Sequence, residues 1–209
     1  MLLQKVIKKQ IFAAKKEAVI DLGSNSIRML IFEDFNKSQI PIFNEKAVCS
    51  LGNTLSLTGK LDPLGVQYSL SVLERFNNIL QNAKVNDVYI FATAAVRDAK
   101  DGEHFKQVVE KIFNKEVEVL TGDQEAERSA NGVILGYEKV NGIVADLGGG
   151  SLELARVKNN VIEKKASLQI GVLRLFNQPK KKKSKKINEI ISQELDSISW
   201  LKKTKAKNL

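Results

Sequence analysis

The sequence predicts a mixed α/β fold that is built twice, with a cleft between the two copies. From Glu17 onward, short apolar runs alternate with turns and amphipathic stretches, which is typical of sheets whose strands are joined by helices. The stretches "VIDLGSNSIRML" and "VADLGGGSLELA" share the frame apolar-x-D-L-G-x-x-S-x-charged, so that Asp21 corresponds to Asp146. Two copies of one hairpin, separated by a domain's length of chain, indicate a duplicated architecture.

The first half begins with a predicted strand-turn-strand unit in "AVIDLG" and "SIRMLIFEDF". A third strand follows in "QIPIFNEKAVCSL", where Pro41 favours a position near the edge of the sheet. The stretch "LDPLGVQYSLSVLERFNNIL" predicts a helix, with Asp62 as N-cap and Pro63 as its first residue. After it we expect a strand in "DVYIFATA", a helix in "DGEHFKQVVEKIFN", a strand in "EVEVL" and a helix that begins at Gly122.

The second half contains three predicted strands, "GIVADLG", "SLELARVKN" and "VIEKKASLQIG". The lysine cluster "PKKKKSKK" then marks a change of composition, and "INEIISQELDSISWLKK" predicts one amphipathic helix. We therefore expect a basic leader over residues 1–16, a first α/β domain over 17–140, the start of a second over 141–178, and a Lys-rich linker with a helix over 179–209. The second domain is predicted to be incomplete.

The formal net charge of +9 lies at the two ends of the chain. Residues 1–16 contain five Lys and no acid, and residues 178–209 contain ten Lys and three acids, which leaves −3 for residues 17–177. Solvated tails explain this pattern, and contact with a polyanion is the alternative. No specific nucleic-acid site is predicted.

The single cysteine, Cys49, excludes an internal disulfide and a cysteine-rich zinc site, and it indicates a reducing compartment such as the cytoplasm. No apolar run approaches the length of a membrane span, and the N-terminus lacks the apolar core and cleavage site of a signal peptide.

The two glycine-containing turns are candidate phosphate-binding loops. Glycine allows the backbone to approach a ligand closely and to turn with positive φ, and successive N–H groups can form an anion-binding nest. An ordinary hairpin turn is the alternative, but the duplication favours two nests that hold adjacent phosphoryl groups. The candidate residues are Ser24, Asn25, Ser26, Gly148, Gly149, Gly150 and Ser151.

Asp21 and Asp146 end apolar strands directly before these turns, where an unpaired buried carboxylate would be costly. Coordination of Mg²⁺ would relieve that cost and neutralise a bound phosphate chain. Glu153 lies near Asp146 if the second hairpin is tight, so one ion could use both. A contact of Asp146 with its own turn is the alternative.

Arg28 and Arg97 are candidate phosphate ligands, because the guanidinium fork suits phosphate oxygens; surface ion pairs are the alternative for each. A general base could be supplied by Glu125 near the start of its helix, and the local pattern does not exclude Asp123 or Glu127. His104, the only histidine, lies in a polar stretch, which argues against histidine-based catalysis.

Four stretches, "AVIDLGSNSIRMLIFE", "FATAAVRDA", "TGDQEAERSANGV" and "IVADLGGGSLELA", together resemble the exopolyphosphatase/guanosine pentaphosphate phosphohydrolase family, and the similarity extends from about residue 18 to about 176. The resemblance implies a ribonuclease H-like fold, as in actin, sugar kinases and heat-shock ATPases. It implies hydrolysis of the terminal phosphate of polyphosphate, and in some members of guanosine pentaphosphate.

Carried over by motif, the catalytic glutamate of the family falls on Glu125 and its Mg²⁺-associated acids fall on Asp146 and Glu153. Arg97 matches a phosphate-contacting arginine, and the two turns match the phosphate loops. The choice of Glu125 over Asp123 and Glu127 comes from the resemblance.

The chain departs from the family at its end, since members continue beyond this length. We therefore also consider a truncated product that is inactive or only binds polyphosphate or a nucleotide, and one that needs a partner, either a second copy or a complementary chain. An actin-like ATPase, suggested by the duplicated hairpin alone, ranks last.

Overall fold

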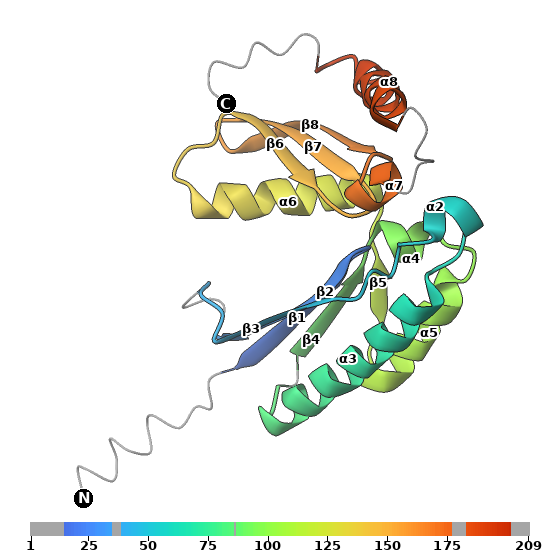
Figure 1. Ribbon diagram of the computed structural model, residues 1–209. Coiled ribbons are helices and arrows are strands. Elements are labelled where there is room, and N and C mark those ends of the chain that lie inside the picture. Colours follow the sequence, from blue (N-terminus) through green and yellow to red (C-terminus); the bar gives the residue numbers. More distant parts are fainter. Residues whose placement is uncertain (1–14, 35–38, 86, 177–182, 202–209) are drawn as a thin grey trace, which may run out of the picture.

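The computed structural model describes residues 15–34, 39–85, 87–176 and 183–201, and its ribbon shows two layered lobes that meet near the glycine turns (Figure 1). Most of the predicted basic leader, part of the lysine cluster and the last eight residues lie outside the described residues. No helix in the described part of the chain is long and apolar enough to cross a membrane.

The first lobe is a five-stranded sheet of order β3-β2-β1-β4-β5 with α3 and α5 on one face (Figure 1). Its antiparallel part is β1, β2 and β3, and its parallel part is β1, β4 and β5. The elements are β1 (Lys16–Leu22), β2 (Ser26–Glu33), β3 (Phe43–Val48), α2 (Leu55–Thr58), α3 (Pro63–Asn82), β4 (Asp87–Ala92), α4 (Ala94–Asp98), α5 (Gly102–Phe113) and β5 (Val117–Val119).

Alternation along β1 and β2 builds the core of this lobe. Ile20, Leu22, Ile27 and Met29 are fully buried, and Phe76 of α3 packs in the same cluster. Their neighbours in sequence point to the other face of the sheet, because successive side chains of a strand alternate. The open face therefore presents the alternate residues of the strands toward the second lobe.

The predicted N-cap of α3 is confirmed, and the helix predicted to begin at Gly122 also starts with a cap. The Asp62 side chain accepts a hydrogen bond from the Gly65 N–H at 2.9 Å, with Pro63 at the first position of α3. At the start of α6, Thr121 and Gln124 form a reciprocal capping box. The predicted edge position of the third strand is also confirmed, because β3 pairs only with β2 in the described chain.

The second lobe is an antiparallel sheet of order β6-β7-β8 between two helical layers. Its elements are α6 (Gly122–Gly136), β6 (Gly142–Leu147), β7 (Leu152–Lys158), β8 (Val161–Leu168), α7 (Val172–Phe176) and α8 (Lys183–Asp196). Ala130 of α6 packs against one face of the sheet, and Ile198 and Trp200, after α8, pack in the cluster on the other.

Two details of this lobe differ from the sequence-based expectations. The last helix is shorter at its C-terminal end than predicted, because α8 ends at Asp196 and the apolar residues after it pack in a turn segment. In addition, α6 precedes the boundary predicted at residue 140 but packs on β7 and β8 (Figure 1). Its buried side chains, Ala126 and Ala130, are small and allow this close approach. This packing would move the boundary between the two α/β domains from residue 140 toward residue 121.

Candidate functional site

Both glycine turns open onto one cavity of about 400 Å³ between the lobes. The cavity contains every predicted site residue except Arg28 and Arg97. Its lining residues are Asp21, Gly23, Ser24, Asn25, Ser26, Phe91, Thr93, Leu120, Glu125, Arg128, Ser129, Asp146, Gly148, Gly149, Gly150, Ser151 and Glu153.

The two turns are closed in the same way. The Gly23 N–H donates to the Ser26 carbonyl at 3.0 Å, and in the second copy the Gly148 N–H donates to the Ser151 carbonyl at 2.9 Å. The sequence repeat therefore corresponds to a repeat of local backbone structure.

The glycines of the second turn serve close approach and not an unusual backbone conformation. The expectation of positive φ is wrong here, since the positive-φ glycines of the described chain lie elsewhere. A Cβ atom on Gly150 would lie 2.5 Å from Ser24 Oγ and 2.8 Å from Ala94 Cβ. The second turn thus packs directly against the first, at a position where a side chain does not fit.

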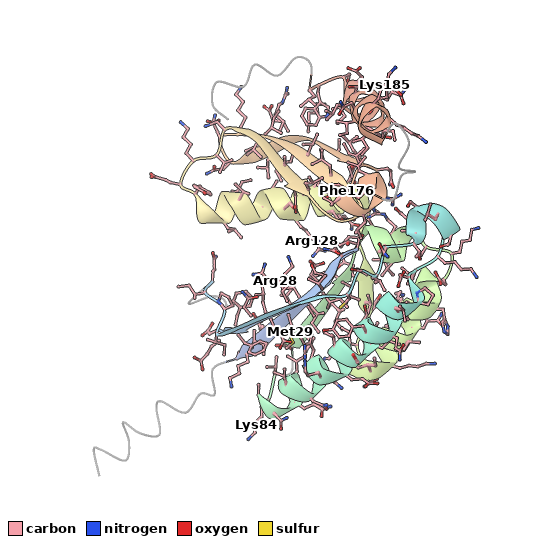
Figure 2. All side chains as sticks on the ribbon, viewed as in Figure 1. Arg28, Met29, Lys84, Arg128, Phe176 and Lys185 are labelled. Atoms are coloured by element: carbon pink, nitrogen blue, oxygen red, sulfur yellow. The ribbon has the colours of Figure 1, made fainter. Side chains whose placement is uncertain are left out.

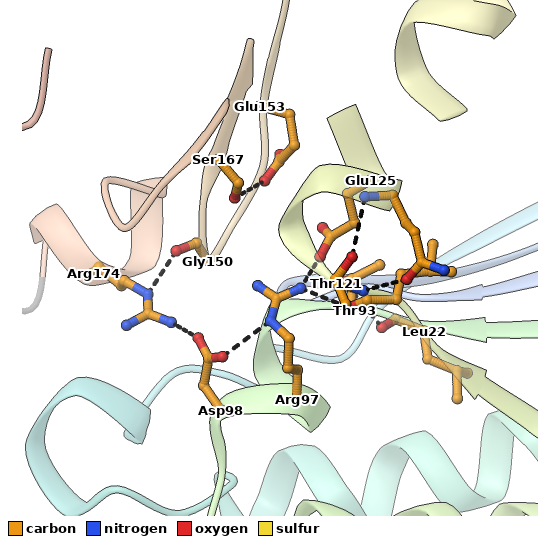
Figure 3. A network of polar contacts seen from close by, with 12 residues as sticks. Leu22, Thr93, Arg97, Asp98, Thr121, Glu125, Gly150, Glu153, Ser167 and Arg174 are labelled. Carbon is orange, nitrogen blue, oxygen red and sulfur yellow. Dashed lines mark hydrogen bonds and ion pairs between the residues drawn. The ribbon is translucent and has the colours of Figure 1, made fainter. Parts of the chain in front are cut away.

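Three carboxylates gather at the ends of the hairpin strands. Asp146 and Glu153 are direct partners in the β6–β7 register, as the tight-hairpin expectation requires. Asp146 accepts a hydrogen bond from Ser129 Oγ at 2.7 Å, from α6 and not from its own turn. Glu153 is buried and accepts from Ser167 Oγ at 2.9 Å (Figure 3).

These carboxylates disfavour one another's ionisation. The expected burial of Asp21 and Asp146 is wrong, since both residues are exposed to the cleft between the lobes. Desolvation in this cleft still raises the pKa of Asp21 to about 6, and Asp146 adds to the rise while Arg28 and Lys46 oppose it. Burial also raises the pKa of Glu153, with a further contribution from Asp146. In the described part of the chain, no three His, Cys, Asp or Glu side chains converge tightly enough to form a ready-made metal cluster.

Glu125 lies in the first turns of α6, and its side chain is only 10% exposed. Burial raises its pKa to about 7, Glu153 and Asp21 add to the rise, and the Arg97 guanidinium opposes it. Of the other two acids left open by the local pattern, Asp123 does not line the cavity and Glu127 forms an ion pair with Lys165 of β8. Position therefore distinguishes Glu125 from its two neighbours.

Arg97 contacts the side chain of Glu125. Its guanidinium forms an ion pair with Glu125, donates to the Leu120 carbonyl at 2.8 Å and to Asp98 Oδ1 at 3.1 Å (Figure 3). Arg28 is exposed and donates to Asn44 Oδ1 at 3.0 Å on the open face of the first sheet (Figure 2). Neither arginine lines the cavity: Arg97 contacts the lining residue Glu125, and Arg28 lies opposite Asp21 in the β1–β2 register.

Arg128 was not predicted from the sequence, and it lies in the space between α6 and the first sheet (Figure 2). Its guanidinium is 4.2 Å from the centre of the Phe91 ring and donates to Glu118 at 2.7 Å. Its spacing of one helical turn from Glu125 was a usable signal, because residues three apart share a helix face. Asp98 and Arg174, which contact each other, gave no local signal.

The strand order of the first lobe, repeated for three strands in the second, defines a ribonuclease H-like, actin-like α/β fold. The chain belongs to the Ppx/GppA phosphatase family, whose model matches residues 30–206. The crystal structure of the Aquifex aeolicus family member aligns with a TM-score of 0.68 at 30% identity, over 87% of this chain and 62% of that one.

Two curated relatives carry names that indicate phosphate chemistry. Exopolyphosphatase 1 of Mycobacterium tuberculosis is 29% identical over 77% of this chain and 47% of its own length. The guanosine-5'-triphosphate,3'-diphosphate pyrophosphatase of Aeromonas hydrophila is 27% identical over 77% of this chain and 32% of its own length. The chain thus spans between about a third and a half of these relatives.

Proposed function

We propose that this chain forms the catalytic cleft of a cytoplasmic, Mg²⁺-dependent phosphohydrolase that releases the terminal phosphate of inorganic polyphosphate, guanosine pentaphosphate or both. One observation carries the proposal: Glu125, with a pKa near 7, lines the same cavity as both glycine turns. A carboxylate whose pKa lies near the working pH is suited to accept a proton from water. The names of the two relatives support the substrate class.

The turns would bind the phosphate chain. Their carbonyls are already bonded, because Ser24 accepts from the Gly52 N–H at 2.8 Å and Gly149 accepts from the Leu173 N–H at 2.8 Å. The amides of Ser24 and Gly150, by contrast, donate to no acceptor within the described residues. Backbone amides that have no acceptor, with the hydroxyl of Ser151 beside them, are suited to donate to the oxygens of a phosphoryl group.

The acidic residues would supply carboxylate ligands to a divalent cation, although no three of the described side chains form a cluster in advance. Asp146 and Glu153 are adjacent on one hairpin, Asp21 faces them from the other, and their mutual repulsion favours a bound cation that balances the charge. Carboxylate oxygens are the ligands that Mg²⁺ prefers. When bound, the ion would neutralise charge on the phosphate chain.

Glu125 would take the proton of the attacking water at its carboxylate, while the Arg97 guanidinium holds that carboxylate in place. The test is phosphate release from polyphosphate, guanosine pentaphosphate and ATP, each with and without Mg²⁺. We expect Glu125→Gln to lower the rate about 10²- to 10⁴-fold, and Glu127→Gln, the matched control on the same helix, to leave it unchanged. Release by Glu125→Gln at the wild-type rate would refute the assigned mechanism, and release from ATP alone would favour an ATPase.

A second candidate is a chain that works only with a partner, and the free edge of β6 favours it. In the described residues β6 pairs only with β7, whereas β1, its counterpart in the repeat, pairs with both β2 and β4. Leu147 is 57% exposed, while Leu22 at the same place in the first copy is fully buried. This candidate predicts that the activity per chain falls on dilution while light scattering shows that the chains dissociate. Constant activity of a monomer would exclude it.

A further inference from the structure

The two lobes are joined beside the cleft by one carboxylate that accepts from both of them. Asp98 is the last residue of α4, whose Ala95 and Val96 pack in the core of the first lobe. Its Oδ1 accepts from Arg97 Nε at 3.1 Å, and its Oδ2 accepts from Arg174, which lies on α7 in the second lobe (Figure 3). The side chains of Asp98 and Arg174 are only 24% and 22% exposed, so solvent screens this pair less than a surface pair.

Each of the two guanidiniums makes another contact that reaches the cleft. On one side Arg97 is bonded to Glu125, and on the other Arg174 Nε donates to the Gly150 carbonyl at 2.6 Å. A continuous series of charge-assisted contacts therefore connects the second glycine turn to Glu125 through Asp98. Planar guanidinium groups fix direction as well as distance, which makes such a series stiff.

We propose that Asp98 is a positioning residue that fixes the second lobe, which carries the second glycine turn and Glu125, against the first lobe by holding Arg174 and Arg97 at once. The inference rests on the proposed function for its catalytic consequence, but the link between the lobes has a readout of its own. In Asp98→Asn only one atom of the side chain can still accept a hydrogen bond, and its amide group faces a guanidinium that also only donates. One of the two arginines must then lose its contact.

The link is tested first without substrate. In a Cys49→Ala background, spin labels at positions 64 and 135, which are exposed on α3 and α6, report the distance between the lobes. We expect Asp98→Asn and Arg174→Gln each to broaden the distance distribution about twofold, since two lobes without this contact sample more relative positions. The matched control is Glu45→Gln, which removes an ion pair with Arg75 inside the first lobe and should leave the distribution unchanged.

The catalytic consequence is tested by phosphate release. We expect Asp98→Asn and Arg174→Gln each to lower kcat about ten- to a hundredfold with KM changed less than about twofold, because misplacement by an ångström has effects of this size. The double variant should be no slower than the slower single variant, since both break one link. Multiplying effects, or an unchanged distance distribution in both single variants, would overturn the proposal.

The two hypotheses fail differently. If the wild-type chain releases no phosphate while the substitutions still broaden the distribution, the proposed function fails and the link stands. If Asp98→Asn does not fold, as its melting curve would show, Arg174→Gln tests the same link from the other lobe.

Discussion

Replacing Glu125 by Gln removes a carboxyl group that the folded protein prefers to keep protonated, and we expect the exchange to stabilise the protein above neutral pH. The fold raises the pKa of Glu125 from its ordinary value of 4.5 to about 7, because burial outweighs the ion pair with Arg97. Between these two values the folded state holds a proton that the unfolded state has released. Stability therefore falls as the pH rises through this window, by about 3 kcal/mol in total.

The assay is urea unfolding at pH 5 and pH 8, followed by circular dichroism and by the fluorescence of the single tryptophan, Trp200. Glu125→Gln should exceed the wild type in free energy of unfolding by about 3 kcal/mol at pH 8 and by about 1 kcal/mol or less at pH 5. Coincidence of the two probes is required, because two lobes can unfold separately.

Glu127→Gln provides a control of opposite sign on the same helix. The Lys165 ammonium lowers the pKa of Glu127, so its ionised form contributes stability that is present at pH 8 and lost as the pH falls through the acidic range. The control should therefore be slightly less stable than the wild type at pH 8. If Glu125→Gln were equal to or less stable than the wild type at pH 8, burial would not dominate the electrostatics of Glu125.

Three further predictions concern activity and binding. The rate of phosphate release should rise with pH around an apparent pKa of about 7, because Glu125 must lose its proton to act as a base and burial raises its pKa to about 7. A flat rate profile from pH 5 to 9 would contradict this. Gly150→Ala should lose most activity and about 1–3 kcal/mol of stability by calorimetry, because its Cβ would clash with the facing turn. Gly148→Ala, whose Cβ would have its nearest neighbour at 3.5 Å, should be tolerated, and equal losses would refute the packing argument. Arg128→Ala should raise KM for polyphosphate about tenfold, measured by steady-state kinetics, and an unchanged KM would place this arginine outside the substrate path.

The elements that the sequence predicted well are those with local signals. Asp62 and Pro63 marked the start of α3, and alternation marked β1 and β2, because capping and side-chain periodicity act within a few residues. The packing of α6 was not predictable in this way. Its buried residues, Ala126 and Ala130, carry little hydrophobic signal, and nothing local says which sheet they contact.

The same division applies to the site. Asp146 and Glu153 could be placed side by side from the hairpin alone, since register follows from a tight turn. The contacts of Arg97 with Glu125 and of Arg174 with Asp98 join segments that are distant in sequence, so only tertiary packing reveals them. The resemblance to a family predicted Glu125 as the catalytic glutamate, whereas the residues that surround it are known only from the structure.

The duplication places different charges on the two halves of the cleft. The same frame places Arg28 opposite Asp21 in the first hairpin and Glu153 opposite Asp146 in the second. In the first hairpin the positive charge of Arg28 therefore favours the ionised form of Asp21. In the second hairpin two acids face each other, and Asp146 raises the pKa of Glu153. Since a divalent cation is favoured where carboxylates lack a cationic partner, the second hairpin is the expected main metal site, with Asp21 contributing from the opposite lobe. Substrate phosphate would then lie between an ion on one turn and backbone amides on the other, within reach of Glu125.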